Sequence, residues 1–291
     1  MAAMTECKMM RLIRRVPWAG EKLAEKLSKN PQVAVLRLSG VIGRTGGIRR
    51  GGLTLEDLAD PIERAFKMPH LSAVALLVNS PGGSPVQSAL ISKRIRALAE
   101  EKKVPVYAFC EDVAASGGYW LACAGDEIHA DGASVIGSIG VVSAGFGFPA
   151  LLEKIGVERR VHTAGDKKAI LDPFQPENPD DIEHLKDLQR DIHDQFKQHV
   201  RDRRGDRLAA DDAVLFSGEF WTGNRAKELG LVDEIGDLRS VMRAKFGEKV
   251  RLSVVGSRKG WIERKFGLQV AWADELVGAL EARGLWGRYG L

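Results

Sequence analysis

Short uninterrupted apolar runs alternate with segments of helical spacing through the middle of the chain. The runs at residues 33–38, 73–78 and 104–109 are bounded by turn residues and predict strands that are buried on both faces. Apolar positions recur at helical spacing between 86 and 100, and residues 119–124 favour another helix. Because strand and helix alternate, the crossovers should be right-handed, and we expect an α/β fold with a mainly parallel sheet.

Further elements follow from the same patterns. Asn178, with the proline and acidic residues after it, predicts the start of a long helix, and its end is predicted at Arg201, Arg203, Arg204 and Gly205. We also expect helices at 222–230 and 238–246 and a strand at 250–254. The long helix carries an apolar stripe that is typical of a core or subunit contact, formed by Ile182, Leu185, Leu188, Ile192, Phe196 and Val200.

Two segments are ambiguous by pattern alone. Thr54 with Asp57 resembles a capping box, and Pro61 in a first helical position predicts that a second helix starts there. Residues 135–152 form a nearly uncharged apolar run that is about long enough for a membrane span. Its glycines and Pro149 divide it into short pieces, so we interpret it as a buried, glycine-turned core segment.

Composition narrows the functional classes. The 291 residues are 44% hydrophobic, which suffices for the core of one large or two modest domains. Basic and acidic residues number 43 and 39, and this balance, without a localised basic face, argues against a nucleic-acid partner. Cys7, Cys110 and Cys123 form an odd set without paired metal spacing, which favours a reducing compartment. We therefore expect no catalytic thiol, no metal and no cofactor.

The two ends of the chain differ from its middle. Residues 1–30 are basic without a long apolar stretch, so we expect no secretory signal peptide, no transmembrane helix and a cytoplasmic location. The predicted organisation is a helical N-terminal extension at 1–30, a folded domain at 31–255 and an amphipathic helical tail at 256–291. Tryptophans among basic residues at both ends fit either docking onto a neighbouring subunit, which we favour, or peripheral attachment to an anionic membrane.

The candidate chemistry lies at two glycine turns, each of which follows a predicted buried strand. Ser116 stands among alanines and glycines at a strand-to-helix turn, where small neighbours leave a hydroxyl exposed, and it is the candidate nucleophile. The other turn contains Gly82 and Gly83. Because ligands bind at the carboxyl ends of parallel strands, the two turns should face one site. We expect the backbone N–H groups of Gly83 and Gly117 to form an oxyanion hole.

A serine hydroxyl needs a base. No histidine has an acidic partner that the sequence imposes. The six are His70, His129, His162, His184, His193 and His199. His129 lies in a predicted edge strand at 127–130, and the last three lie on the predicted long helix, where a polar-face position is the default. Lys167 and Lys168 precede the apolar residues 169–171, and in an extended segment only one of two neighbours points inward. Burial beside apolar groups could lower a lysine pKa by the roughly three units that a base near neutral pH requires.

Five motifs stand in a characteristic order and spacing between about residues 33 and 236. They are VNSPGG at 78–83, VAASGGY at 113–119, GSIGV at 137–141, GDKK at 165–168, and WTG at 221–223 with LGLVD at 229–233. Together they resemble the signal peptide peptidase A family of serine peptidases, the S49 group that includes SohB-like proteins. The resemblance implies a ClpP/crotonase-like fold of repeated β-β-α units with a mainly parallel sheet and peripheral helices.

The resemblance also implies a mechanism. Family members use a Ser-Lys dyad to hydrolyse peptides through an acyl-enzyme, with signal-peptide remnants or other short or membrane-derived peptides as substrates. Members of this length form multimers, so we expect a homo-oligomer with active sites near subunit interfaces. The matching positions are Ser116 as nucleophile, Lys168 and not Lys167 as general base, Gly83 and Gly117 as oxyanion hole, and Ser138 as the residue that orients the lysine.

Two other functions fit part of the pattern. A crotonase-like acyl-CoA enzyme would share the fold and the paired backbone amides, but its chemistry generally uses a carboxylate where Ser116 stands. A catalytically silent scaffold that binds peptides would be favoured if Lys168 faces solvent.

Overall fold

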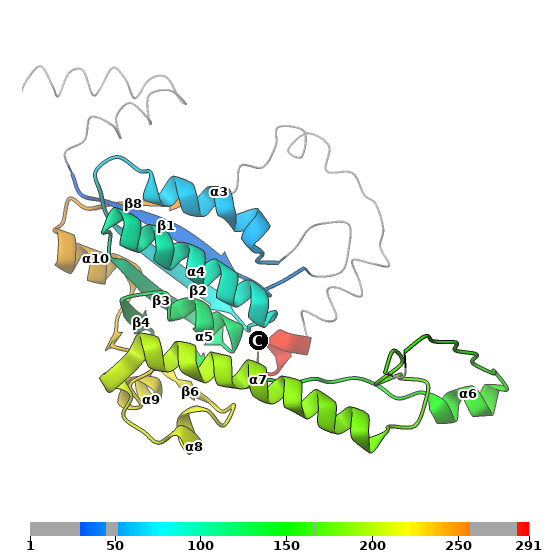
Figure 1. The fold of residues 1–291 in the computed structure, drawn as a ribbon. Helices are drawn as coiled ribbons and strands as arrows, with labels where there is room; N and C mark the ends of the chain where they lie inside the picture. Colours follow the sequence, from blue (N-terminus) through cyan, green and yellow to red (C-terminus); the bar gives the residue numbers. More distant parts are fainter. Residues whose placement is uncertain (1–29, 45–51, 166, 257–283, 291) are drawn as a thin grey trace, which may run out of the picture.

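The computed structural model describes residues 30–44, 52–165, 167–256 and 284–290 and arranges them around one sheet (Figure 1). The strands are β1 (Gln32–Ser39), β2 (Leu71–Ser80), β3 (Val106–Ala115), β4 (Glu127–Ala130), β5 (Val135–Gly137), β6 (Phe220–Thr222), β7 (Glu234–Ile235) and β8 (Arg251–Val255). The helices are α3 (Leu55–Phe66), α4 (Pro85–Lys102), α5 (Gly117–Ala122), α6 (Pro149–Ile155), α7 (Pro179–Arg204), α8 (Asp212–Leu215), α9 (Gly223–Glu228) and α10 (Leu238–Phe246), with a 3-10 turn, η1, at Gly205–Arg207. The predicted N-terminal extension and most of the predicted tail lie outside the described residues.

The sheet is mainly parallel. Its strands lie in the order β6-β5-β3-β2-β1-β8, and β4 and β7 continue it beside β3. Every neighbouring pair is parallel except β5 with β6. This arrangement confirms the α/β fold with a mainly parallel sheet that the sequence predicts. Because β1, β2 and β3 run in the same direction, the turns that follow them meet at one edge of the sheet.

Alternate residues of each central strand point to opposite faces of the sheet, and both faces are covered. In β1, Leu36 and Leu38 belong to the large core beneath α3, α4 and α5, which cover one face (Figure 1). Val33 and Val35 point the other way and pack in a smaller core with Met242 of α10. Both faces of the central strands are therefore buried, which explains why these strands appear in the sequence as uninterrupted apolar runs.

Residues 55–66 form a single helix, so the prediction of a separate helix from Pro61 is wrong. Thr54 is the N-cap, as predicted, and its hydroxyl accepts a hydrogen bond from the Asp57 N–H at 3.2 Å. Pro61 lies inside α3, where it costs one helical hydrogen bond. The helix continues because the following turns are buried against the sheet, through Pro61, Ile62, Ala65 and Phe66.

Two further predictions need correction. The strand that carries His129 is not an edge strand, because β4 pairs with β3 on one side and with β7 on the other. The predicted buried segment at 135–152 is buried from Ile136 to Ile139 only, and beyond Gly140 its apolar side chains are partly or fully exposed. We call residues 141–178 the arm; with α6 at its centre, the arm projects away from the sheet in Figure 1.

Helix α7 begins and ends where the sequence predicts. Asn178 caps its first turn by accepting a hydrogen bond from the Asp180 N–H at 3.0 Å, and Gly205 follows its last residue. The apolar stripe divides into two parts. Phe196 and Val200 are buried in the core, whereas Leu188 in the first half is 48% exposed. The second half of α7 is thus a core helix, and the first half extends beyond the core.

Candidate active site

Ser116 lies at a strained elbow between β3 and α5. Its backbone has φ 53° and ψ −124°, a conformation that costs a residue with a side chain of order 1–3 kcal/mol. The Ser116 N–H donates to the Gly137 carbonyl at 2.8 Å, which fixes the elbow against the end of β5. The side chain makes no capping bond to α5 and is half-buried. The elbow therefore presents a hydroxyl that is fixed in place and accessible.

The two glycine turns pack directly against each other. A Cβ atom on Gly82 would lie 2.8 Å from the Ser116 Cβ and 3.0 Å from the Gly117 nitrogen, so only glycine fits there. Gly83 runs alongside Ile42, and a Cβ on it would meet the Ile42 carbonyl oxygen at 2.1 Å. Among the described residues, neither the Gly83 N–H nor the Gly117 N–H donates to a protein oxygen. Both groups are free to bind a ligand oxygen beside Ser116.

A cavity of about 820 Å³ opens at this elbow. Ser116, Gly83 and Ser138 all line it, so the structure brings three of the predicted site residues together. One wall is the first half of α7, and the C-terminal segment adds Leu285 and Arg288. The apolar part of its lining is formed by Val141, Val142, Leu185, Leu188 and Ile192. The exposed part of the α7 stripe thus faces the cavity.

Ser138 is held rigidly in this wall. Its side chain is buried, and its backbone has a positive φ of 51°. The Ser138 N–H donates to the Glu219 carbonyl at 2.6 Å, and the preceding Gly137 carbonyl accepts the Ser116 N–H. Ser138 and Ser116 are therefore connected through the backbone of one residue.

Lys168 is not part of this cavity. It lies on the arm, in a turn closed by a hydrogen bond from its N–H to the Gly165 carbonyl at 3.2 Å. The side chains of both Lys167 and Lys168 are exposed. The expectation of an extended segment that buries one lysine is therefore wrong for a single copy of the chain. A turn forms instead, and Ala169 and Leu171 beside it are exposed.

Two histidines of α7 point inward, contrary to the prediction of a polar-face position. His193 Nε2 lies 3.1 Å from the Ile139 carbonyl oxygen, and His199 Nε2 lies 3.2 Å from the Trp120 carbonyl oxygen. His199 also stacks on Trp120, with ring centroids 5.0 Å apart. Burial lowers the pKa of His199 to about 4. The signal that could have revealed them is their spacing, because each lies three residues from the buried Phe196 and so shares its face.

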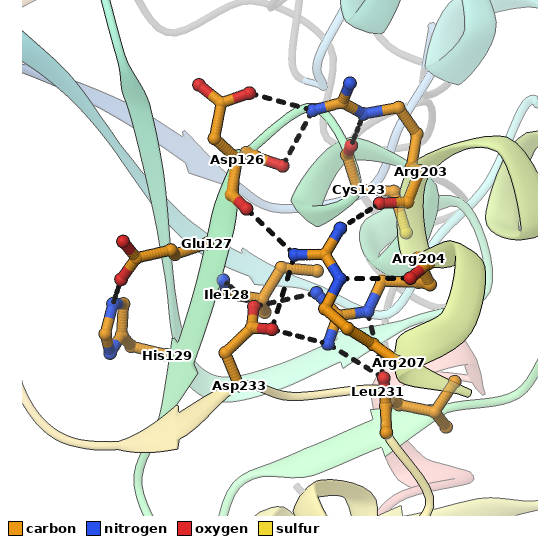
Figure 2. A network of polar contacts seen from close by, with 12 residues as sticks. Cys123, Asp126, Glu127, Ile128, His129, Arg203, Arg204, Arg207, Leu231 and Asp233 are labelled. Carbon is orange, nitrogen blue, oxygen red and sulfur yellow. Dashed lines mark hydrogen bonds and ion pairs between the residues drawn. The ribbon is translucent and has the colours of Figure 1, made fainter. Parts of the chain in front are cut away.

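The C-terminal end of α7 is fixed by a buried arginine. Arg204 donates to the Asp233 carboxylate at 2.7 and 3.0 Å and to the Gly230 carbonyl, and its side chain is 1% exposed (Figure 2). Burial would raise the pKa of Asp233, but hydrogen bonds from Arg204 and the Ile128 N–H hold it below its ordinary value. Neighbouring Arg203 donates to the Cys123 carbonyl after α5. These contacts position the helix whose other half forms the cavity wall.

The cysteines of the described residues are unsuited to nucleophilic chemistry. Burial raises the pKa of the Cys123 thiol to about 11 and that of Cys110 further still. Both side chains lie in the core. No cluster of three acidic, histidine or cysteine side chains that could hold a metal ion occurs in the parts of the chain that the structure describes. Ser116, half-buried at the cavity, therefore stays the candidate nucleophile.

Comparison with known proteins identifies the family. The sequence model of Peptidase family S49 matches residues 98–251, more than half of the chain, and this region includes the Ser116 elbow and the arm. The chain belongs to peptidase family S49. The resemblance recognised from the sequence motifs is confirmed.

Several curated proteins are similar to this chain over part of their own length. A Brucella abortus protein named Na(+)/H(+) antiporter NhaA is 50% identical over 273 residues, which are 89% of this chain and 37% of that protein. An Enterococcus faecium protein that carries the provisional name signal peptide peptidase SppA is 27% identical over 91% of this chain and 81% of its own length. The chloroplastic serine protease SPPA of Arabidopsis thaliana is 32% identical over 74% of this chain and 32% of its own length.

The S49 chain therefore spans little more than a third of its Brucella relative. Among the residues that the structure describes, no helix has both the length and the apolar character needed to cross a bilayer. The predicted domain boundaries and cytoplasmic location stay predictions.

Proposed function

We propose that this chain is a serine peptidase in which Ser116 is the nucleophile and Lys168 the general base. The observation that carries the proposal is the elbow of this S49 family member. A strained Ser116 stands at the mouth of a cavity beside the N–H groups of Gly83 and Gly117, which donate to no oxygen of the described residues. This arrangement supplies a nucleophile and two donors for a developing oxyanion.

The reaction would proceed in two halves. The neutral amine of Lys168 accepts the proton from the Ser116 hydroxyl as its oxygen attacks a peptide carbonyl, and the N–H groups of Gly83 and Gly117 stabilise the oxyanion. The lysine then gives its proton to the departing amine, which leaves an ester on Ser116. Water, activated by the same lysine, hydrolyses this acyl-enzyme. Ser138, buried in the cavity wall, would orient the lysine.

The substrate class follows from the cavity wall. Side chains of Val142, Leu185 and Leu188 face the space in front of Ser116 and would favour peptides with apolar residues near the scissile bond. Remnants of signal peptides and other short or membrane-derived peptides have this character. The names of the Enterococcus and Arabidopsis relatives agree with such an activity.

Because Lys168 is exposed and lies outside the cavity, the peptidase proposal includes a second copy of the chain. The arm that carries Lys168 has a large apolar surface that the described residues leave exposed, at Val142, Phe146, Leu151, Ile155, Val157, Leu171 and Phe174. Apolar patches of this kind mark protein interfaces. We infer a homo-oligomer in which the arm of one copy brings Lys168 to the Ser116 elbow of its neighbour.

The same exposure favours the scaffold alternative, in which the protein binds peptides without cleaving them. A fluorogenic peptide library with apolar residues separates the two functions. The wild type should hydrolyse peptides, Ser116→Ala and Lys168→Ala should lose activity by at least about 10³-fold, and Lys167→Ala serves as the matched control that retains activity. The rate should rise with pH as the base deprotonates. Peptide binding without hydrolysis by the wild type would establish the scaffold.

Mixing inactive variants tests the shared site. If subunits exchange, a mixture of Ser116→Ala and Lys168→Ala chains should regain activity at about a quarter of the sites, because the intact residues then meet across some interfaces. Wild-type activity without any recovery in exchanged mixtures would show that both residues come from one chain.

A further inference from the structure

His193 lies where three parts of the cavity wall meet. It projects from α7, is half-buried and lines the cavity together with Ser116 and Ser138. Its Nε2 is 3.1 Å from the Ile139 carbonyl oxygen. A carbonyl oxygen only accepts hydrogen bonds, so Nε2 carries the proton in this contact. The contact links α7 to the residue that follows Ser138.

The segment from Gly137 to Gly140 depends on a small number of hydrogen bonds. The Gly137 carbonyl accepts the Ser116 N–H, and the Ser138 N–H donates to the Glu219 carbonyl. Ser138 has a positive φ of 51°, which a residue with a side chain retains only when its surroundings hold it. The His193 ring adds a side-chain contact to the carbonyl of Ile139, the residue that follows this strained one.

The turn at 216–218 also lies beside the His193 ring. The Phe216 carbonyl lies near the His193 ring and favours its protonated form. Gly140 and Gly218 approach so closely that a Cβ on Gly140 would lie 3.2 Å from the Gly218 Cα. A shift of Ile139 would therefore move two walls of the cavity.

The charges around the ring favour a neutral histidine. Burial, together with the charge of Lys197 one turn along α7, lowers the pKa of His193. The Ile139 carbonyl, Asp194 and the Phe216 carbonyl act in the opposite direction but do not reverse the shift. With a single proton on Nε2, the neutral ring donates to the Ile139 carbonyl.

We propose that His193 is a positioning residue for peptide hydrolysis, which holds the Ile139 carbonyl against α7 and thereby keeps Ser138 at the edge of the site. This role rests on the proposed peptidase function. In this role His193 transfers no proton. It acts through the segment from Gly137 to Gly140, which contains Ser138.

The test compares three variants of the full-length chain by peptide hydrolysis. His193→Ala should lower kcat about tenfold with a smaller change in KM, since it removes a single hydrogen bond. His193→Gln, whose side-chain amide can donate from nearly the same place, should recover to within about threefold of the wild type. His184→Ala, on the exposed face of α7, is the matched control and should leave kcat unchanged. If His193→Ala does not fold, His193→Asn replaces it, because its shorter side chain cannot reach Ile139.

A double-mutant cycle with Ser138→Ala distinguishes positioning from a general packing role. If His193 acts through Ser138, the loss from Ser138→Ala should be several-fold smaller in the His193→Ala background than in the wild type. The proposal is overturned if the factors by which the two single substitutions lower kcat simply multiply in the double variant. It is also overturned if His193→Gln loses as much kcat as His193→Ala. Active wild type with fully active His193→Ala would refute this inference alone. A wild type that hydrolyses no peptide would refute the proposed function and this inference with it.

Discussion

The contact between the two glycine turns can be tested by adding one methyl group. Gly82→Ala places a Cβ 2.8 Å from the Ser116 Cβ, whereas carbon atoms in contact lie about 3.5–4.0 Å apart. The Ser116 elbow must therefore retreat by about 1 Å. A misplacement of this size at a catalytic group can lower a rate about 10²-fold, so kcat should fall by that factor.

Gly40→Ala provides a matched control. Gly40 has φ 108°, close to the 104° of Gly82, but a Cβ on it would meet nothing within 4 Å. Both variants incur about 1–3 kcal/mol of backbone strain, offset by about 0.4–1 kcal/mol because alanine restricts the unfolded chain. Gly82→Ala adds an overpacking cost of about 1–3 kcal/mol. The difference between the two variants thus isolates the close approach from the strain.

The assays are urea denaturation followed by tryptophan fluorescence and hydrolysis of an apolar fluorogenic peptide. Gly82→Ala should be less stable than Gly40→Ala by about 1–3 kcal/mol and should show the lower kcat. Equal stability of the two variants, with kcat of Gly82→Ala within about threefold of Gly40→Ala, would refute the packing of the two turns. The denaturation result stands independently of the proposed enzymatic activity.

Three further predictions concern strain, charge and pH. Ser116→Gly should be about 1 kcal/mol more stable to urea than Ser116→Ala, because glycine relieves the strain at φ 53°. Arg204→Met should lower the free energy of unfolding by about 3–5 kcal/mol, because Asp233 loses its buried partner and retains the longer pair with Arg207 at 3.4 Å; Asp233→Asn in addition should restore part of the loss. Burial lowers the pKa of His199 from 6.5 to about 4, so its contribution to stability is fully present above pH 6.5 and is lost as pH falls toward 4. The free energy of unfolding should fall less between pH 7 and pH 4 in His199→Gln than in the wild type, by up to about 3 kcal/mol, as measured by urea denaturation at both pH values.

The sequence predicts the core elements well because their signals are local. The apolar run of β2 is visible in the chain, as are the Asn178 cap of α7 and the bounds of α10 at Leu238–Phe246. Pro61 misled the prediction because its usual place is a first helical turn. In α3, burial of the residues around it outweighs the lost hydrogen bond, and this is a tertiary effect that no local pattern contains.

Within the site, the sequence predicts which turns lie next to each other, but it does not predict which way the side chains point. Ser116 and Gly82 could be brought together from the sequence because turns after neighbouring parallel strands share one edge of the sheet. His193 was missed because a histidine on an amphipathic helix usually faces solvent, and its acceptor at Ile139 is 54 residues away. Long-range contacts of this kind need the packed fold.

The arm is the segment whose structure a single copy of the chain explains least. The arm is held together by its own contacts. Phe148 packs on Phe174 with 5.6 Å between their ring centroids. Arg159 lies 4.7 Å from the centroid of the Phe174 ring and pairs with Asp172. Yet Phe146 is 82% exposed. A segment that is ordered by its own contacts but apolar outside loses little conformational entropy when a second surface covers it. The same covering would remove water from the turn that carries the proposed base, so assembly and activation of the site would be one event.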